Sequence, residues 1–346
     1  MRILYGVCGE GFGHSSRALS IAAFLEKQGH EVVIVTYGQA YKILRNRFKV
    51  FKVRGLHLIF KRGELQYKKT VYFNIKNFTK NLVRWKAFHK LMRDFKPELC
   101  ISDMEVIVPV LSNWYKLPLI SVDNQHRITN LDIKFPGKYY KDYLIARTVV
   151  SKIVSNADYY IVTSFSKTKI LKKNTFIVSP VIRKEVLKLK PKIGEKILCY
   201  LTKKDSKILS VLKKIVNKKF VVYGYNINEK DRNLEFKKRE TFFEDLKDCK
   251  AIIATAGFTL ISEALYLKKP YLALPLKGQF EQTINALFLK QAGYGDYSEN
   301  LTEHELKNFL ENINIFRKKL NNYNSNNKEL FVVLEKILNK IKNKES

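Results

Sequence analysis

The strongest constraint on the fold is the alternation of short apolar runs with helix-like segments, which starts at the first residues of the chain. Arg2–Val7 is a strand-like apolar run, and a glycine-rich turn follows at residues 9–14. A helix is predicted from about Ser15 to a stop near Gly29, and residues 31–37 form the next apolar run. Strands that alternate with helices in this way build parallel sheets. The pattern predicts an α/β fold of the doubly wound type.

The same alternation occurs twice along the chain. With 346 residues the chain exceeds the size at which one core stops growing, so two domains are expected. A lysine-rich stretch around residues 181–194 is the predicted linker, and an amphipathic helix is predicted at the C-terminus. The predicted boundaries are residues 1–180, 181–325 and 326–346. Further strands are predicted near residues 98–105, 117–126, 158–165, 174–181, 196–201, 219–224, 251–256 and 270–275, and helices near 78–95, 138–155, 206–217, 242–249, 259–267 and 282–292.

The charge balance predicts an anionic partner. The chain has 64 Lys and Arg against 32 Asp and Glu, a net charge of +32. Such a field attracts nucleic acid, anionic lipid or phosphorylated substrates. No recognition helix or base-stacking motif stands out, so we expect no nucleic-acid partner and favour peripheral contact with an anionic membrane. An AT-biased genome, which enriches lysine and asparagine, explains the same charge without any partner.

The cysteines and the apolar runs bear on the compartment. Cys8, Cys100, Cys199 and Cys249 are far apart and form no C-x-x-C pair, which argues against a zinc site or a disulfide framework. No run approaches the ~18 apolar residues that span a bilayer, and the N-terminus does not read as a signal peptide. We expect a cytoplasmic protein with peripheral contact at the inner face of the membrane.

Two other features allow rival interpretations. Gly9, Gly11 and Gly13 are spaced G-x-G-x-G, whereas a dinucleotide site needs G-x-G-x-x-G, and the second strand ends in Thr36 instead of an acidic residue. A nicotinamide or flavin site is therefore disfavoured. The aromatic residues of the basic segment are expected in the core rather than on a base-stacking platform. They are Tyr67, Tyr72, Phe73, Phe78 and Trp85.

Residues 2–32, RILYGVCGEGFGHSSRALSIAAFLEKQGHEV, resemble the first β-α unit of GT-B glycosyltransferases. The resemblance is greatest to the GlcNAc transferase that forms lipid II, with its family 28-like C-terminal domain, and to related prokaryotic transferases with a DNQH segment, here residues 123–126. It implies two Rossmann-like domains facing a cleft, the first for the acceptor and the second for a nucleotide sugar. In that group a histidine, here His14, closes the glycine loop of Gly11 and Gly13 and faces the acceptor.

Residues 255–286 look like the donor-binding stretch of the same families. Gly257 opens a helix whose terminal amides can hold a diphosphate without a metal. The resemblance implies that Phe258, Thr259 and Leu260 form the end of this helix, and that Glu263 binds the ribose. It implies that Gln279, Glu281 and Gln282 contact the sugar hydroxyls. It also implies that Phe243 lies at the edge that binds the base, and that Arg183 reaches the diphosphate. A second glycine-rich loop is replaced here by YLTKKD, in which Thr202, Lys203 and Lys204 are the candidates to substitute for its amides.

The predicted chemistry is inverting transfer of a hexose from a UDP-sugar, without metal or cofactor, to a glycan or lipid-linked acceptor of the cell envelope. Inversion needs a base at the acceptor hydroxyl. Four side chains at strand ends compete for that role: His14, Asp103, Glu105 and His126. We favour His14 assisted by Asp103, although each of the four also fits a helix cap or turn. A UDP-sugar 2-epimerase of the same architecture and an inactive sugar-nucleotide-binding protein remain alternatives.

Overall fold

The computed structural model describes residues 1–57, 59–61, 64–82, 85–202 and 204–345 and divides the chain into two compact units. The first unit comprises Met1–Val181 together with Asn326–Ser346, and the second comprises Ile182–Ser325. The chain therefore leaves the first unit once and returns to it, and the C-terminal helix is part of the first unit.

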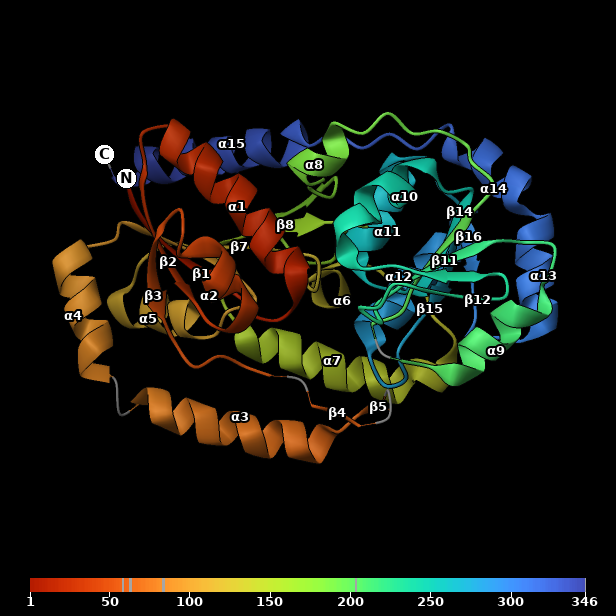
Figure 1. The fold of residues 1–346 in the computed structure, drawn as a ribbon. Coiled ribbons are helices and arrows are strands. Elements are labelled where there is room, and N and C mark those ends of the chain that lie inside the picture. Colours follow the sequence, from red (N-terminus) through yellow and green to blue (C-terminus); the bar gives the residue numbers. More distant parts are fainter. Residues whose placement is uncertain (58, 62–63, 83–84, 203, 346) are drawn as a thin grey trace. The chain divides into compact units, whose positions relative to one another are not determined.

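The first unit contains a parallel sheet of seven strands in the order β3-β2-β1-β6-β7-β8-β9 (Figure 1). The order runs outward in both directions from the β1–β6 pair, as in a doubly wound sheet. The predicted fold class is confirmed for this unit. The strands are β1 (Arg2–Val7), β2 (Glu31–Thr36), β3 (Lys49–Lys52), β6 (Leu99–Asp103), β7 (Leu119–Asp123), β8 (Tyr159–Thr163) and β9 (Thr175–Val178), with β4 (Phe60–Lys61) and β5 (Glu64–Leu65) as a separate pair.

The second unit contains its own seven-stranded sheet, in the order β12-β13-β11-β10-β14-β15-β16. All neighbouring strands are parallel except β12, which runs antiparallel to β13 at the edge. Its centre, β10 next to β14, repeats the reversal found in the first sheet. The strands are β10 (Ile197–Tyr200), β11 (Phe220–Tyr223), β12 (Glu229–Asp231), β13 (Leu234–Phe236), β14 (Ala251–Thr255), β15 (Tyr271–Leu274) and β16 (Gly295–Tyr297).

Helices connect the strands of both sheets. In the first unit they are α1 (Gly11–Lys27), α2 (Gly38–Leu44), α3 (Tyr67–Leu82), α4 (Trp85–Phe95), α5 (Ile107–Tyr115), α6 (Arg127–Asn130), η1 (Gly137–Tyr139), α7 (Tyr140–Ile153) and α15 (Lys328–Glu345). In the second they are α8 (Lys184–Leu187), α9 (Ser206–Lys214), η2 (Arg239–Thr241), α10 (Phe242–Asp248), α11 (Phe258–Tyr266), α12 (Phe280–Gln291), α13 (Glu303–Glu311) and α14 (Ile313–Leu320).

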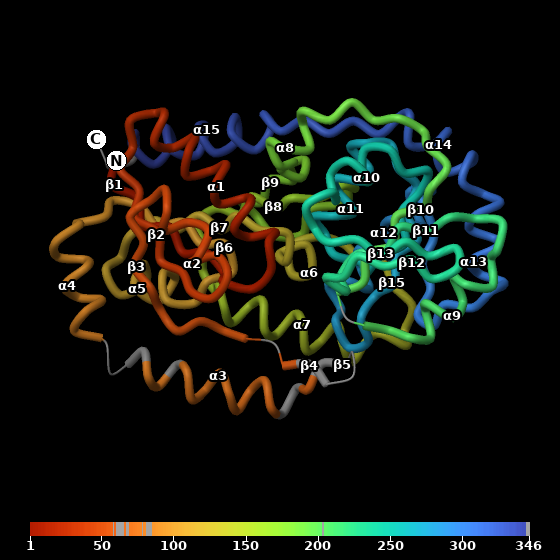
Figure 2. The backbone as a smooth tube through the Cα atoms, viewed as in Figure 1, coloured from red at the N-terminus to blue at the C-terminus, as the bar shows by residue number. Residues whose placement is uncertain are grey.

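The first sheet is covered by apolar side chains on both faces. Along β1, Ile3 and Tyr5 belong to one buried cluster, whereas Leu4 belongs to the cluster on the opposite face. The last helix, α15, lies alongside α1 (Figure 2), and the rings of Phe24 and Phe331 stack with centroids 4.7 Å apart. The C-terminal segment therefore completes the core of the first unit.

Two predicted helices differ most from the observed ones. Helix α1 begins at Gly11 instead of Ser15, so Gly13 and His14 lie in its first turn. The positive φ of Gly11, +72°, lets the chain enter the helix directly after β1. The segment 78–95 was predicted as one helix, whereas residues 78–82 lie in α3 and residues 85–95 form α4, and α3 begins at Tyr67. The start of α3 was missed because its apolar residues do not mark a core-facing side.

The predicted burial of the aromatic segment is wrong for Tyr72, which is 72% exposed, and for Phe73, which is 40% exposed. Trp85 packs against the core as expected. The side chains of Tyr67 and Phe78 lie outside the part of the chain that the structure describes.

Candidate functional site

Polar residues gather at the carboxyl ends of β1 and β6, at the point where the first sheet reverses its strand order. Val7 and Asp103, the last residues of these strands, are register partners. His14 follows in the first turn of α1. Ligands of open α/β sheets bind in the crevice outside such a reversal. Two of the predicted residues, His14 and Asp103, are therefore brought together at the edge where chemistry is expected.

His14, Asp103 and Arg17 form one hydrogen-bonded group. His14 Nδ1 lies 2.6 Å from Asp103 Oδ1, and Arg17 donates from Nε to Oδ2 at 2.8 Å and from Nη2 to Oδ1 at 2.7 Å. The Asp103 carboxylate is fully buried, whereas the His14 side chain is 14% exposed. Of the three groups, the imidazole therefore retains contact with the surface.

The electrostatics of this group keep Asp103 ionised beside His14. Burial alone raises the pKa of a carboxyl, but the charges and hydrogen bonds of Arg17 and His14 outweigh it and hold the pKa of Asp103 below its usual value. An anionic Asp103 favours the imidazole tautomer that carries its proton on Nδ1. The remaining nitrogen, Nε2, then has a lone pair for a substrate hydroxyl. This is the arrangement in which a carboxylate orients a histidine base.

Arg17 was missed in the sequence analysis. It lies three residues after His14, so both side chains project from the same side of α1. The three-residue spacing is the one sequence signal that points to Arg17. The spacing becomes informative only once Asp103 is known to lie next to this side of α1. Gly11 leaves room beside this turn, because a Cβ built there would meet no atom within 4 Å.

Glu105 has a different surrounding from Asp103. Its two carboxylate oxygens accept hydrogen bonds from the backbone N–H groups of Ile107, at 2.9 Å, and Val108, at 2.8 Å, at the start of α5. Burial raises the pKa of Glu105 to about 7, although these N–H groups act in the opposite direction. The carboxylate is thus used inside the fold to cap a helix.

We expect the Glu105→Gln variant to lose a pH-dependent component of stability. A carboxyl whose folded pKa exceeds its ordinary value stabilises the fold fully at low pH, and this contribution disappears as the pH rises through about 7. From pH 4.5 to pH 8 the wild type should lose up to about 3 kcal/mol relative to the variant. Urea unfolding at several pH values measures the difference. Parallel stability curves for the two proteins would contradict the assignment.

His126 and Asp123 form a second histidine–carboxylate pair, at the end of β7. His126 Nδ1 lies 2.7 Å from Asp123 Oδ2, and Ser121 Oγ donates to the same oxygen at 2.6 Å. Burial opposes ionisation of Asp123, but the contacts with His126 and Ser121 hold its pKa below the usual value. The His126 side chain is 2% exposed and packs against Tyr160. His126 therefore lacks the surface contact that His14 has, and it stabilises the turn after β7.

In the second unit, Gly257 is the N-cap of α11, and it follows the end of β14 next to the central strand β10. A Cβ built at Gly257 would meet no atom within 4 Å. Phe258, Thr259 and Leu260 form the first turn, which contains no acidic side chain. The positive end of the α11 dipole therefore faces open space next to its cap, as an anion site requires.

Three residues nominated separately from the sequence meet in this unit. Arg183 donates from Nε and Nη2 to the two oxygens of Glu263, the second at 2.6 Å, and its guanidinium lies 4.9 Å from the ring centroid of Phe243. Burial disfavours the charge of Arg183, but Glu263 outweighs this and raises its pKa. Glu263 is fully buried and Arg183 keeps 18% of its side chain exposed. The pair is a bidentate fork with one accessible side.

The remaining predicted donor contacts are placed as follows. Gln282 is buried and accepts a hydrogen bond from Leu276 N at 3.0 Å, so it holds the loop after β15. Gln279 is the N-cap of α12, and Glu281 lies in the first turn of that helix, half-buried. Thr202 is exposed in the loop between β10 and α9.

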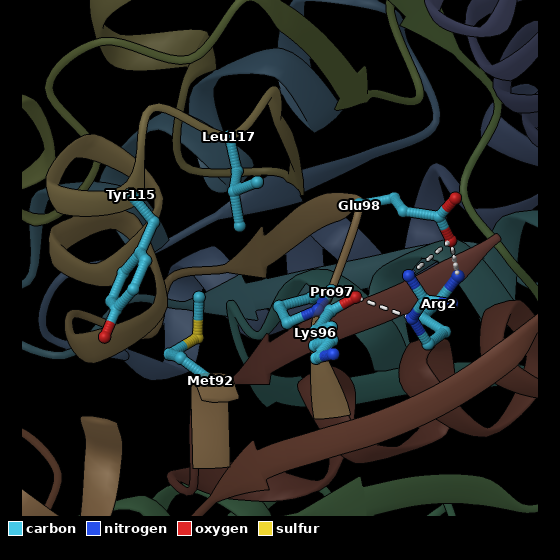
Figure 3. A pocket seen from close by; sticks show the side chains of 7 residues that line it. All are labelled: Arg2, Met92, Lys96, Pro97, Glu98, Tyr115 and Leu117. Carbon is cyan, nitrogen blue, oxygen red and sulfur yellow. Dashed lines mark hydrogen bonds and ion pairs between the residues drawn. The ribbon is translucent and has the colours of Figure 1, made fainter. Parts of the chain in front are cut away.

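A surface pocket lies elsewhere in the first unit, at the amino ends of β1 and β6. It has a volume of about 370 Å³, and Arg2, which donates to Lys96 O and Glu98, forms one wall (Figure 3). This is the edge opposite Asp103, so the pocket is separate from the polar group. Within the described residues, no cluster of three or more His, Cys, Asp or Glu is arranged to hold a metal ion. Among the helices of the same residues, none is long and apolar enough to cross a bilayer.

Comparison with known proteins identifies a family for this chain. A family model described as Glycosyl transferase family 1 matches residues 1–314. An uncharacterized glycosyltransferase of Methanosarcina acetivorans is 22% identical over 325 residues, which cover 85% of each chain.

Solved structures share the fold at low sequence identity. The glycotransferase of kitacinnamycin superposes with a TM-score of 0.68 at 12% identity, covering 96% of this chain and 95% of its own. The spinosyn rhamnosyltransferase SpnG, solved in complex with thymidine diphosphate, superposes with a TM-score of 0.62 at 13% identity, covering 96% of each chain. The two-domain architecture of these proteins is the GT-B fold.

Proposed function

Because the chain belongs to glycosyltransferase family 1, we propose that it transfers a hexose from a nucleotide sugar to a hydroxyl acceptor with inversion at the anomeric carbon. The observation that carries the proposal is the buried Asp103 carboxylate holding His14 in the orientation of a base. The acceptor oxygen attacks the anomeric carbon while the bond to the diphosphate breaks. His14 takes the hydroxyl proton, and the nucleoside diphosphate leaves.

The second unit is the proposed donor site. The open N-terminus of α11 suits a diphosphate, and Glu263 suits the ribose hydroxyls. Because Arg183 covers Glu263, the proposal requires that Arg183 shifts from the carboxylate towards the diphosphate when the donor binds. Phe243, stacked on Arg183, then lies beside the base. The positive potential of the helix end and of Arg183 stabilises the departing diphosphate without a metal.

For the donor we propose a UDP-sugar, and for the acceptor a glycan or lipid-linked carrier used in cell-envelope synthesis. The resemblance of residues 2–32 to lipid II-forming transferases supports this acceptor class. The net charge of +32 supports a reaction at the inner face of an anionic membrane. SpnG, which binds thymidine diphosphate, makes TDP-sugars the donors to test beside UDP-sugars.

A donor screen tests the proposal directly. Thermal unfolding is measured with UDP, TDP, GDP and CDP, since a ligand at 100 times its dissociation constant adds about 2.7 kcal/mol of stability. The nucleotide that raises the melting temperature is then supplied as labelled sugar nucleotides with lipid and glycan acceptors. If none of the four diphosphates stabilises the protein, the donor site is wrong. Interconversion of a sugar nucleotide without acceptor would show epimerisation instead of transfer.

The Glu263→Gln variant should bind the selected nucleotide about 10- to 100-fold more weakly than the wild type. The amide keeps the size of the side chain but loses the negative charge of the carboxylate, whose oxygens are proposed to accept hydrogen bonds from the ribose hydroxyls. Isothermal titration with the nucleoside diphosphate measures the loss, and thermal unfolding without nucleotide confirms that the variant is folded. Glu311→Gln, an exposed carboxylate at the end of α13, is the control. Equal affinities in all three proteins would remove Glu263 from the ribose site.

A further inference from the structure

Helix α3 presents an apolar face to the outside of the first unit. Val71 is 58% exposed, Tyr72 is 72% exposed and Ile75 is 61% exposed. Ile75 lies four residues after Val71 and three after Tyr72, and helix side chains at these two spacings lie next to each other, so the three form one strip. An exposed helix of a monomer normally turns charged or polar residues outward. We therefore expect the strip to bind a partner that has an apolar interior.

The opposite side of α3 fixes this orientation. Asn74 donates from Nδ2 to His57 O at 2.9 Å and accepts from His57 N at 2.8 Å. Thr70, one turn earlier, is buried, and its Oγ1 accepts a hydrogen bond from Ile59 N at 3.0 Å. Thr70 and Asn74 thus face the protein, whereas Val71, Tyr72 and Ile75 face away from it. Rotation of the helix about its axis would break these hydrogen bonds.

Lysines border the apolar strip. Lys69, Lys76 and Lys80 are all exposed, at spacings of seven and four residues that place them in a row next to the strip. From residue 66 to residue 93 the sequence contains no Asp or Glu. The basic residues of that stretch are Lys68, Lys69, Lys76, Lys80, Arg84, Lys86, Lys90 and Arg93.

The charge decides which partner fits. A second copy of the chain, paired about a two-fold axis, would bring one lysine row against the other. An anionic bilayer instead offers phosphate groups to the lysines and acyl chains to the strip, as for helices that lie in the membrane interface. We propose that α3 docks the first unit on an anionic lipid bilayer through Val71, Tyr72 and Ile75, with Lys69, Lys76 and Lys80 on the headgroups. This inference identifies the surface that makes the membrane contact of the proposed function, and it rests on that contact.

Vesicle co-sedimentation tests the docking surface. Wild-type protein should sediment with phosphatidylglycerol-containing vesicles, less with pure phosphatidylcholine vesicles, and less at high salt. The variant Val71→Ser/Tyr72→Ser/Ile75→Ser should partition to the anionic vesicles at least about tenfold more weakly. The matched control is Val216→Ser/Ile315→Ser/Val332→Ser, which removes three exposed apolar side chains from other elements and should bind as the wild type does.

The outcomes separate this inference from the donor site. Thermal unfolding of the α3 variant at the wild-type temperature shows that it is folded, and stabilisation by the selected nucleoside diphosphate shows that its donor site is intact. Equal binding of the α3 variant and the wild type to anionic vesicles would overturn the proposal, as would equal binding of the wild type to neutral and anionic vesicles. A wild-type dimer that becomes monomeric in the α3 variant, without vesicle binding by either, would assign the strip to a second copy.

Discussion

Replacing His14 with alanine is expected to lower kcat for sugar transfer by about 10²- to 10⁴-fold and to leave the affinity for the nucleoside diphosphate unchanged. His14 belongs to the first unit and is proposed to remove the proton of the acceptor hydroxyl, whereas the nucleotide is proposed to bind to the second unit. Labelled-sugar transfer at saturating donor measures kcat, and titration with the nucleoside diphosphate measures affinity.

Two further variants make this result specific. His304→Ala removes an exposed histidine of α13 and should retain wild-type kcat. Asp103→Asn keeps the shape of the orienting residue but removes its charge, so it should lower kcat in the same direction as His14→Ala. If His14→Ala transferred sugar within about twofold of the wild-type rate, a different group would have to be the base.

The Arg17→Met variant is expected to lose about 3–5 kcal/mol of unfolding free energy at pH 7. Arg17 supplies two hydrogen bonds and a positive charge to Asp103, which is fully buried, and methionine supplies neither. Urea unfolding measures the loss. Arg93→Met, at an exposed arginine paired with Asp94, should change stability by no more than about 0.5 kcal/mol.

The pH dependence identifies Asp103 as the cause. Its pKa lies below the ordinary value in the folded protein, so its ionisation stabilises the fold above the ordinary pKa of about 4, and this is lost as the pH falls through the lower folded pKa. That acid-dependent loss should shrink in Arg17→Met. Adding Asp103→Asn should recover part of the stability at pH 7, because the uncompensated charge is gone. No recovery in the double variant would contradict the assigned role.

The sequence alone was sufficient for the architecture. β1 was predicted with its observed ends, and α10 was predicted within one residue of its observed end. The strand prediction holds because buried parallel strands are short continuous apolar runs, and the helix prediction holds because apolar residues recur with the helical period; both patterns are local. The position of His14 after one strand and Asp103 at the end of another also followed, because carboxyl ends of neighbouring parallel strands meet at one edge.

The sequence could not separate the four candidate bases. Asp103 and Glu105 are two residues apart, yet one carboxylate bonds His14 and the other caps α5. His126 resembles His14 in having a carboxylate partner, and only burial distinguishes them. Which neighbour a side chain reaches depends on the rotamer and on packing against distant segments, and neither has a local pattern.

By itself, then, the order of apolar and polar residues determined two doubly wound sheets and the edge where polar groups collect. The tertiary structure alone decided that Arg17 completes the His14–Asp103 group, that Arg183 covers Glu263, and that the apolar strip of α3 faces outward. The two sheets and their polar edge are the first set, and they follow from helices and strands whose regular hydrogen bonding is encoded within short segments. The second depends on contacts between residues up to 86 positions apart, which form only when the chain has folded.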